Sequence, residues 1–96
     1  MADRKFRTLQ KDIAAAGTPE QLDALKTYAE DAVLIKAKST NTGLIYIANN
    51  ETDADGASGN NFTLQANEAI ELDLDNLDEV WLDAEVNGEG VEILLG

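Results

Sequence analysis

The sequence predicts a mainly β protein: a small antiparallel β-sandwich or barrel with one short N-terminal helix or extended arm. The length of 96 residues, 44% of them hydrophobic, fits a single globular domain. Hydrophobic and polar residues alternate in several later segments, as in strands that have one face in water. Short polar turns separate these segments at intervals of about ten residues. We therefore expect an arm and a short helix in residues 1–31 and a β-sandwich in residues 32–96.

A helix start lies in the N-terminal third of the chain. In Thr18-Pro19-Glu20-Gln21, threonine suits the N-cap, proline the first helical position and glutamine the capping box. The spacing of Leu22, Leu25 and Ala29 then fits the apolar stripe of a short helix. Upstream, a weaker pattern fits a strand that includes Phe6, Thr8 and Ile13.

The clearest alternation begins at residue 33. One set of side chains is expected to face inward and the other outward: Val33, Ile35 and Ala37 against Leu34, Lys36 and Lys38. Residues 44–48 (LIYIA) are rich in β-branched and aromatic side chains. The intervening STNTG contains Asn and Gly, which tolerate positive φ. This arrangement predicts a hairpin of strands 33–38 and 44–48.

Three further strands follow a short one at residues 62–64 and a polar break at residues 65–68. In the first, the inward side chains are Ile70, Leu72 and Leu74, and the outward ones are Glu71, Asp73 and Asp75. In the second, the inward side chains are Val80, Leu82, Ala84 and Val86, and the outward ones are Trp81, Asp83 and Glu85. The turn at residues 87–90 (NGEG) predicts a second hairpin, with residues 91–95 as its returning strand.

The charge is acidic and unevenly distributed. The formal net charge is -12, yet residues 1–38 hold seven Lys or Arg against six Asp or Glu. Residues 39–96 hold thirteen acids and no base. A surface without bases repels phosphate, so we expect no nucleic-acid partner. No segment has the roughly 18 apolar residues of a membrane span, and the N-terminus lacks the apolar core of a secretory signal.

Cysteine and histidine are both absent from the sequence. This excludes disulfides, thiol chemistry, Cys/His zinc sites and Ser–His or Cys–His catalysis. Paired carboxylates such as Asp73 and Asp75 are two apart on one strand face, side by side in water, whereas a glycosidase needs two carboxyl groups across a cleft. No glycine-rich phosphate loop is present. We therefore expect no enzyme activity and no cofactor.

Bases and an aromatic residue gather at the N-terminus: Arg4, Lys5, Phe6, Arg7 and Lys11. They fit either a solvated arm or an arm that docks on an acidic neighbour, such as another copy of the chain. Trp81 is a second candidate contact residue, because a large aromatic on the outward side of a strand can anchor a partner. Alternatively, Trp81 packs beneath the N-terminal segment or in the second layer of the sandwich.

The polar stretch 49–61 (NNETDADGASGNN) resembles half of a calcium loop. Glu51, Asp53 and Asp55, followed by Gly56, have the spacing of the first EF-hand ligands. The bidentate acid expected at position twelve is replaced by Phe62, and the flanking segments read as strands instead of helices. The three carboxylates are therefore weak metal candidates, and we expect the exposed tip of an outward-facing hairpin.

Nearly the whole chain resembles a group of small virion proteins of tailed phages. The similarity is carried by VLIKAKSTNTGLIYIAN, by FTLQANEAIELDLDNLDEVWLDAEVNGEGVEILL and by the lead-in AAAGTPEQL. The shared outline is an N-T-G turn, an I-Y strand, a variable polar loop, a D-N-L step and a final N-G turn. Here the loop at residues 49–61 is longer and more acidic than in the group. Residues 65–68 read Q-A-N-E where proline-glycine is usual.

The resemblance implies a non-enzymatic β-sandwich on the outside of a virion, made in the host cytoplasm. Its most fitting role is a capsid decoration, or cement, protein that binds the major capsid protein and stabilises the head, often as a homotrimer. The alternative is a tail, baseplate or head-spike adhesin module that binds host carbohydrate or a receptor. In the decoration role, residues Met1 to Lys11 are expected to clasp a capsid subunit or a sister protomer.

Overall fold

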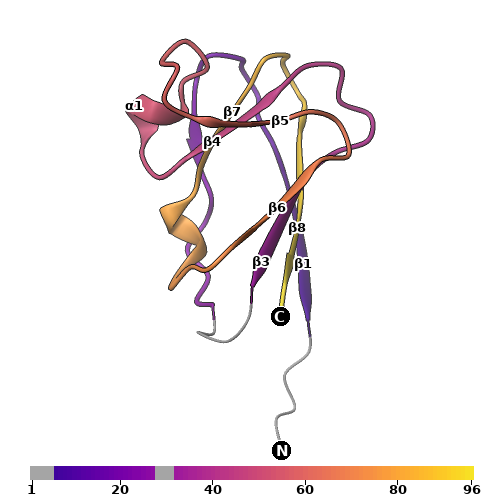
Figure 1. Ribbon diagram of the computed structural model, residues 1–96, viewed down its shortest axis with the longest axis vertical. Coiled ribbons are helices and arrows are strands. Elements are labelled where there is room, and N and C mark those ends of the chain that lie inside the picture. The colour runs from indigo at the N-terminus through magenta and orange to yellow at the C-terminus, as the bar shows by residue number, and fades with distance from the viewer. Residues whose placement is uncertain (1–5, 28–31) are drawn as a thin grey trace, which may run out of the picture.

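The fold consists of two four-stranded antiparallel sheets that pack face to face (Figure 1). The structure is a computed structural model, and residues 6–27 and 32–96 of it are described here. The strands are β1 Arg7–Asp12, β2 Glu20–Gln21, β3 Val33–Ala37, β4 Ile45–Ala48, β5 Phe62–Leu64, β6 Ala69–Leu72, β7 Trp81–Ala84 and β8 Gly90–Leu95. Two short helices are α1 Glu51–Ala54 and the 3₁₀ turn η1 Leu77–Glu79. The mainly β, sandwich-like fold expected from the sequence is therefore confirmed.

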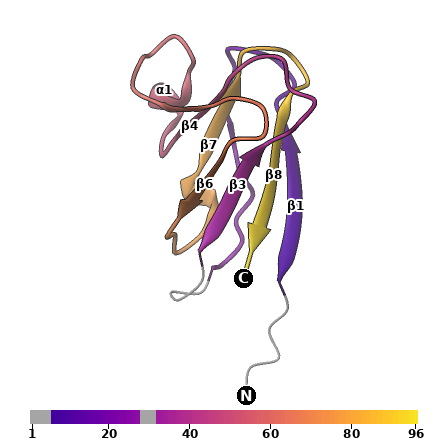
Figure 2. The same ribbon diagram turned by 45° about the vertical axis from the view of Figure 1, so that its right-hand side comes forward.

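Sheet A has the order β1-β8-β3-β6 and sheet B the order β2-β7-β4-β5 (Figure 2). Strands β1 and β6 are thus the edges of sheet A, and β2 and β5 the edges of sheet B. The core lies between the sheets and is almost entirely aliphatic, with these fully buried side chains: Ile13, Val33, Ile35, Ile45, Leu77, Leu82, Val91 and Leu95. Burying each such side chain stabilises the fold by about 1.5–3 kcal/mol.

The expected alternation of residues 33–37 is confirmed, but both predicted hairpins are wrong. Strand β3 lies in sheet A and the next strand, β4, in sheet B. Likewise β7 lies in sheet B and β8 in sheet A. Each polar turn therefore carries the chain across the sandwich. The reason is that turn residues such as Gly88, with a φ of 80°, allow the chain to reverse but do not fix which strand it pairs with next.

The predicted helix from Thr18 is also wrong for the described residues. Residues 20–21 form strand β2 against β7, and Lys26 makes an isolated bridge with Asn76. The backbone N–H of Leu22 donates to Val80 at 3.0 Å, and its side chain is only 4% exposed. Pairing with β7 and burial of Leu22 outweigh the weak local helix preference. Ala29, the last residue of the expected stripe, lies outside the described residues.

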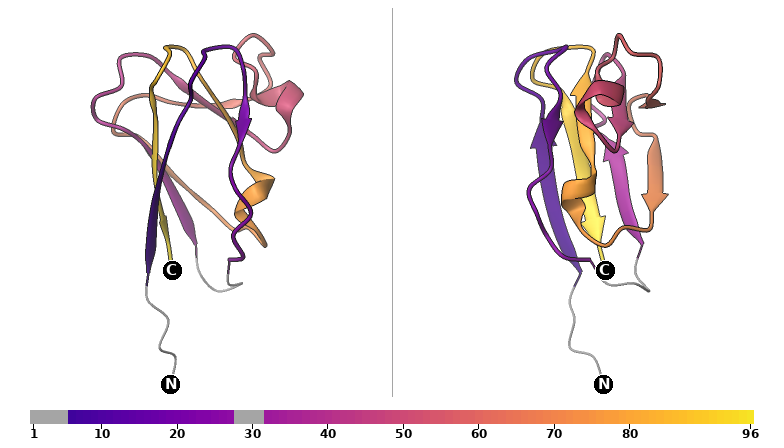
Figure 3. Two further views of the ribbon diagram at one scale, coloured as in Figure 1. Left: turned by 180° about the vertical axis from the view of Figure 1, so that it is seen from behind. Right: turned by 90° about the vertical axis from the view of Figure 1, so that its left-hand side faces the viewer.

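The N-terminal residues do not form a separate arm from Phe6 onward. Arg7–Asp12 is the edge strand β1, paired with β8 over its whole length, from Arg7 opposite Leu95 to Asp12 opposite Gly90. The right panel of Figure 3 shows β1 and the β2 segment running along one side of the sandwich. The predicted upstream strand is thus confirmed, and it belongs to the sandwich that was expected to begin at residue 32. Arg4 and Lys5 lie outside the described residues.

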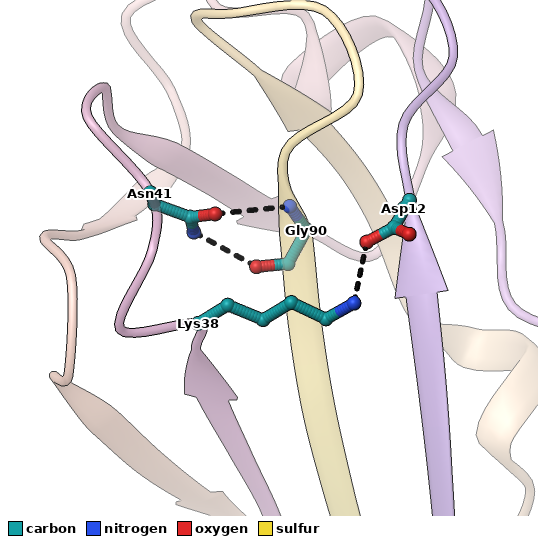
Figure 4. A network of polar contacts seen from close by, with 4 residues as sticks. All are labelled: Asp12, Lys38, Asn41 and Gly90. Carbon is teal, nitrogen blue, oxygen red and sulfur yellow. Dashed lines mark hydrogen bonds and ion pairs between the residues drawn. The ribbon is translucent and has the colours of Figure 1, made fainter.

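A polar network joins the two turns that cross between the sheets. The buried Asn41 amide donates to the carbonyl of Gly90 at 2.8 Å and accepts from its N–H at 3.3 Å (Figure 4). Beside it, the Lys38 Nζ lies 2.7 Å from the Asp12 Oδ1. The Glu89 carboxylate accepts from the N–H groups of Thr42 at 2.7 Å and Gly43 at 2.9 Å. This network fixes one end of the sandwich.

Candidate interaction surfaces

The polar stretch 49–61 connects the paired strands β4 and β5, as expected, but it is folded and not merely a solvent-exposed tip. Asn50 caps α1 by accepting from the N–H of Asp53 at 2.8 Å, and Ala54 is fully buried. The Asn61 amide donates to the carbonyls of Asp53 and Asp55 at 3.1 and 3.0 Å. The segment therefore closes on itself and packs against sheet B.

Two of the three candidate metal ligands, Asp53 and Asp55, form hydrogen bonds within this loop. The Asp53 carboxylate accepts from the Asn50 amide at 3.0 Å, and that of Asp55 accepts from the Ala57 N–H at 2.9 Å. Glu51 begins α1 and is exposed. Within residues 6–27 and 32–96, no three acidic side chains come close enough to hold a metal ion. The polar side chains of residues 49–61 therefore cap helix α1 and stabilise turns.

Asp83 is the one fully buried acid among the described residues, with 1% of its surface exposed. It points to the outer face of sheet B, as the alternation predicted, but two loops cover it. Its Oδ1 accepts from the N–H groups of Gly17 at 2.9 Å and Ala84 at 2.8 Å. Its Oδ2 accepts from the Gly56 N–H at 2.8 Å. Asp83 therefore fastens both loops onto sheet B.

Tyr46 lies directly across from Asp83 on the same face. Gly56 packs against its ring so closely that an added Cβ would lie 2.6 Å from the ring carbon Cε2. Burial raises the pKa of the Tyr46 hydroxyl, and the nearby carboxylates of Glu85 and Asp83 add to the rise. The loop thus covers one side of the ring and limits its access to ligands.

Trp81 is half-buried on this outer face, between Ala48 of β4 and Gln21 of β2. Trp81 was expected either to be an outward contact anchor or to pack beneath the N-terminal segment, and the structure has a feature of each. Its outward direction is that of an anchor, and the N-terminal segment lies beside it. Tyr46 and Trp81 are thus both half-buried on this face.

An apolar groove of about 250 Å³ opens between β1 and the extended segment that follows β2. This β1/β2 groove is lined by Leu9, Lys11, Leu22, Leu25, Leu77 and Ile93. Leu9 belongs to the inner face of sheet A, yet it is 39% exposed because β1 is an edge strand. Phe6, which precedes β1, is 71% exposed. The sandwich is thus apolar and open along this edge.

Two of the predicted N-terminal contact residues border the same edge. The Lys11 Nζ pairs with the Glu20 Oε1 at 2.8 Å, which joins β1 to β2 across the groove. This ion pair lowers the pKa of Glu20, as does the N–H of Ala14, which donates to the same carboxylate. The Arg7 guanidinium donates to the carbonyls of Lys26 and Gly96 at 3.3 and 3.2 Å. Arg7 and Lys11 therefore lie along one side of the sandwich in strand β1, and Phe6 directly precedes this strand.

A second apolar groove, of about 270 Å³, opens at the opposite side of the sandwich. This β5/β6 groove is lined by Ile47, Phe62, Ile70, Leu72, Leu74 and Val80. Phe62 is 55% exposed, although it is one of only two phenylalanines in the chain. The sequence placed Phe62 in a short strand and at the position of a missing calcium ligand, and it did not indicate that this side chain is exposed. Its place at the first position of a three-residue strand, directly after a polar loop, was the available signal of an exposed edge.

Comparisons with protein-family models, with curated proteins and with solved structures give no match for this chain. In the part of the chain that the structure describes, no helix is long and apolar enough to cross a membrane.

Proposed function

We propose that the protein is a non-enzymatic structural protein of a tailed-phage virion, and specifically a capsid decoration protein. In this role it binds the major capsid protein on the outer surface of the head, after synthesis in the host cytoplasm, and forms a trimer there. The observation that carries the proposal is the likeness of its sequence to small phage virion proteins, now joined to a sandwich fold of the kind that this likeness implies.

The shape and charge of the molecule suit this role. One end of the sandwich is fixed by the contacts of Asn41 and Glu89, while both sides present apolar grooves beside edge strands. The outward Glu71 of β6 and the exposed Asp73 and Asp75 that follow it are acidic. A rigid body with a solvated acidic side and an apolar side can attach to a shell without any reactive group. The groove beside Leu9 and Lys11 is the better candidate for the docked side, because the bases of the chain lie near it.

The proposed role is tested by measuring whether the protein binds to phage heads that lack it. The purified chain is mixed with such capsids from the phage that encodes it, and the pellet is analysed after centrifugation. Saturable binding to heads, with density at symmetry axes in electron microscopy, is the expected result. Attachment to tails alone would contradict the decoration role.

The side that docks is tested with the same assay. Deleting residues 1–11, as the expected arm would suggest, removes most of β1 and is unsuitable. Substitution of Phe6 and Leu9 by serine leaves the β1 backbone in place and should weaken capsid binding at least tenfold. The matched control is Phe62→Ser in the opposite groove. Equal loss in both variants would contradict docking through the β1/β2 side.

The alternative, an adhesin that binds carbohydrate, is favoured by the half-exposed ring of Trp81 on the outer face of sheet B. A sugar would stack on this ring, so Trp81→Ala should abolish retention on a glycan array while leaving capsid binding intact. Retention of no glycan by the intact chain would remove the alternative.

A further inference from the structure

We propose that two copies of this chain associate head to tail, with strand β1 of one copy pairing antiparallel with strand β6 of the next. The two strands are the opposite edges of sheet A, so each copy offers both halves of the contact. The inference concerns self-association: the contact covers the β1/β2 groove, so it competes with docking of that groove on a capsid and does not rest on the proposed function.

The hydrogen bonds within sheet A show which backbone groups of β1 face away from the sheet. The N–H of Ile13 donates to Glu89, which sets the odd-numbered residues of β1 as those bonded to β8. The N–H and carbonyl groups of Thr8, Gln10 and Asp12 therefore point outward from the sheet. Among the described residues no strand pairs with this edge.

The same reasoning applies to β6 at the other edge. The N–H of Ala37 donates to Glu68, so the even-numbered residues of β6 bond to β3. The backbone groups of Ala69 and Glu71 therefore point outward, and here too the described residues supply no strand partner. Strand β6 runs antiparallel to β3, and β3 runs parallel to β1 because both flank β8. A copy added at the β1 edge in the same orientation thus continues the antiparallel sheet.

Pairing the outward backbone groups of β1 and β6 also places the outer-face side chains of the two strands on the same side of the extended sheet. The side chains of Thr8, Gln10 and Asp12 lie on the outer face of sheet A, as those of Ala69 and Glu71 do. With Gln10 opposite Glu71 of the next copy, Leu9 stands opposite the half-buried Leu72 of that copy. A shift by one residue would mismatch both the hydrogen bonds and the faces. The backbone and the side chains therefore select the same set of registers.

The apolar grooves and the charges favour a second copy as the occupant. The β1/β2 groove and the β5/β6 groove lie at opposite sides of one molecule and meet in the proposed contact, which covers the exposed Leu9 and Phe62. Three bases, Arg7, Lys11 and Lys26, lie on or near the first edge, where Lys11 is paired with Glu20 and Asp23 also lines the groove. The second edge is built from the stretch after residue 38, which contains no base. The first edge is thus less acidic than the second, and salt at about 0.15 M weakens the repulsion between charges that are more than about 8 Å apart.

The experiment blocks each edge separately with proline. Gln10→Pro and Glu71→Pro each remove an outward N–H that no bond within sheet A uses, and proline is tolerated at such positions of edge strands. Gln10→Ala and Glu71→Gln are the matched controls that keep the N–H. The molar mass of each variant is measured by sedimentation velocity at about 0.15 M salt, where net-charge repulsion is screened, with circular dichroism to check the fold.

A head-to-tail contact gives a specific pattern of results. The original chain and both controls should form multimers, and each proline variant alone should be a monomer. Mixing the two proline variants should restore association, but only to a one-to-one dimer, because each retains one intact edge of the opposite kind. The restored dimer also shows that both variants are folded.

Three results would overturn the proposal. One is a monomeric original chain throughout a concentration series that reaches about 1 mM, which would detect dissociation constants up to about that value. Another is normal association of either proline variant alone, which would place the contact elsewhere. The third is a mixture that stays monomeric while the original chain associates.

Discussion

Replacement of Asp83 should loosen two loops at once. In Asp83→Asn, one carboxylate oxygen becomes an amide NH₂, which cannot accept a hydrogen bond. If the retained oxygen stays with Gly17 and Ala84, the NH₂ faces the N–H of Gly56, and two donors oppose each other. The flipped amide instead loses Gly17 and Ala84. Either orientation therefore leaves at least one backbone N–H without an acceptor in a buried place.

The expected size of the effect follows from these contacts. A hydrogen bond to a charged group contributes about 1.5–3 kcal/mol, and an unsatisfied buried donor costs about 1–3 kcal/mol. Because asparagine is neutral, the variant no longer buries a charge, and this offsets part of the lost stability. We therefore expect Asp83→Asn to lower the free energy of unfolding by about 2–3 kcal/mol, or roughly 10–20 °C in Tm for a domain of this size.

The assay is urea unfolding followed by the fluorescence of Trp81, the one tryptophan in the chain. Amide hydrogen exchange adds a local measurement, since the N–H of Gly56 should exchange faster in the variant. The matched control is Asp73→Asn, the same chemical change at an exposed position. An effect of less than about 0.5 kcal/mol at Asp83, the usual range of surface substitutions, would refute the reasoning.

Three further predictions concern the loops and turns. Asn41→Ala removes both bonds to Gly90 at a buried site and should cost about 2–4 kcal/mol in urea unfolding; a neutral result would show that water replaces the amide. Gly56→Ala drives a methyl group into the Tyr46 ring and should cost about 1–3 kcal/mol, with a changed near-ultraviolet dichroism of the tyrosine as its sign. The hydrogen bond from the N–H of Gly43 is the main cause of the lowered pKa of Glu89. The Glu89 carboxylate therefore stabilises the fold fully at pH values above its ordinary pKa of 4.5. This contribution to stability is lost as the pH falls through the lower pKa of the folded state. Glu89→Gln should therefore be less stable than the original chain at neutral pH, and the difference in stability should shrink in acid; a difference that does not narrow as the pH is lowered below 4.5 would contradict the assignment.

The alternation of residues was a reliable guide to the faces of the strands, except at Val86, which was expected to face inward but lies beyond β7 and is 38% exposed. Val33, Ile35 and Ala37 are buried as predicted, and Glu71 and Asp73 are exposed. This success has a simple cause, because a strand places successive side chains on opposite faces whatever it pairs with. The mainly β fold followed from the same pattern.

The alternation of residues could not predict which strands pair with each other. The turns at residues 39–43 and 87–90 have the composition of hairpin turns, yet both lead from one sheet to the other. The choice depends on contacts far apart in sequence, such as Asn41 with Gly90. The extended course of residues 20–22 has the same origin, since Leu22 is buried against strands that come much later.

The sequence pattern also could not predict which loops cover the outward face of a strand. Alternation placed Asp83 outward, and it is outward, but nothing local shows that the loops at Gly17 and Gly56 fold over it. The candidate surfaces show the same limit. The N-terminal bases were recognised as a group, whereas their strand conformation and the exposed Phe62 on the opposite side depend on the assembled sandwich.

The position of β8 in sheet A has a consequence for folding during synthesis. It lies between β1 and β3, yet it is the last strand in chain order. Strand β1 therefore finds its partner only after every other strand has been made. Until then its backbone groups and Leu9 are available to other chains, so newly made protein is most prone to mispairing before residues 90–95 emerge from the ribosome. Slow codons or a bulky fusion near β8 should lower the yield of folded protein more than the same change near β5.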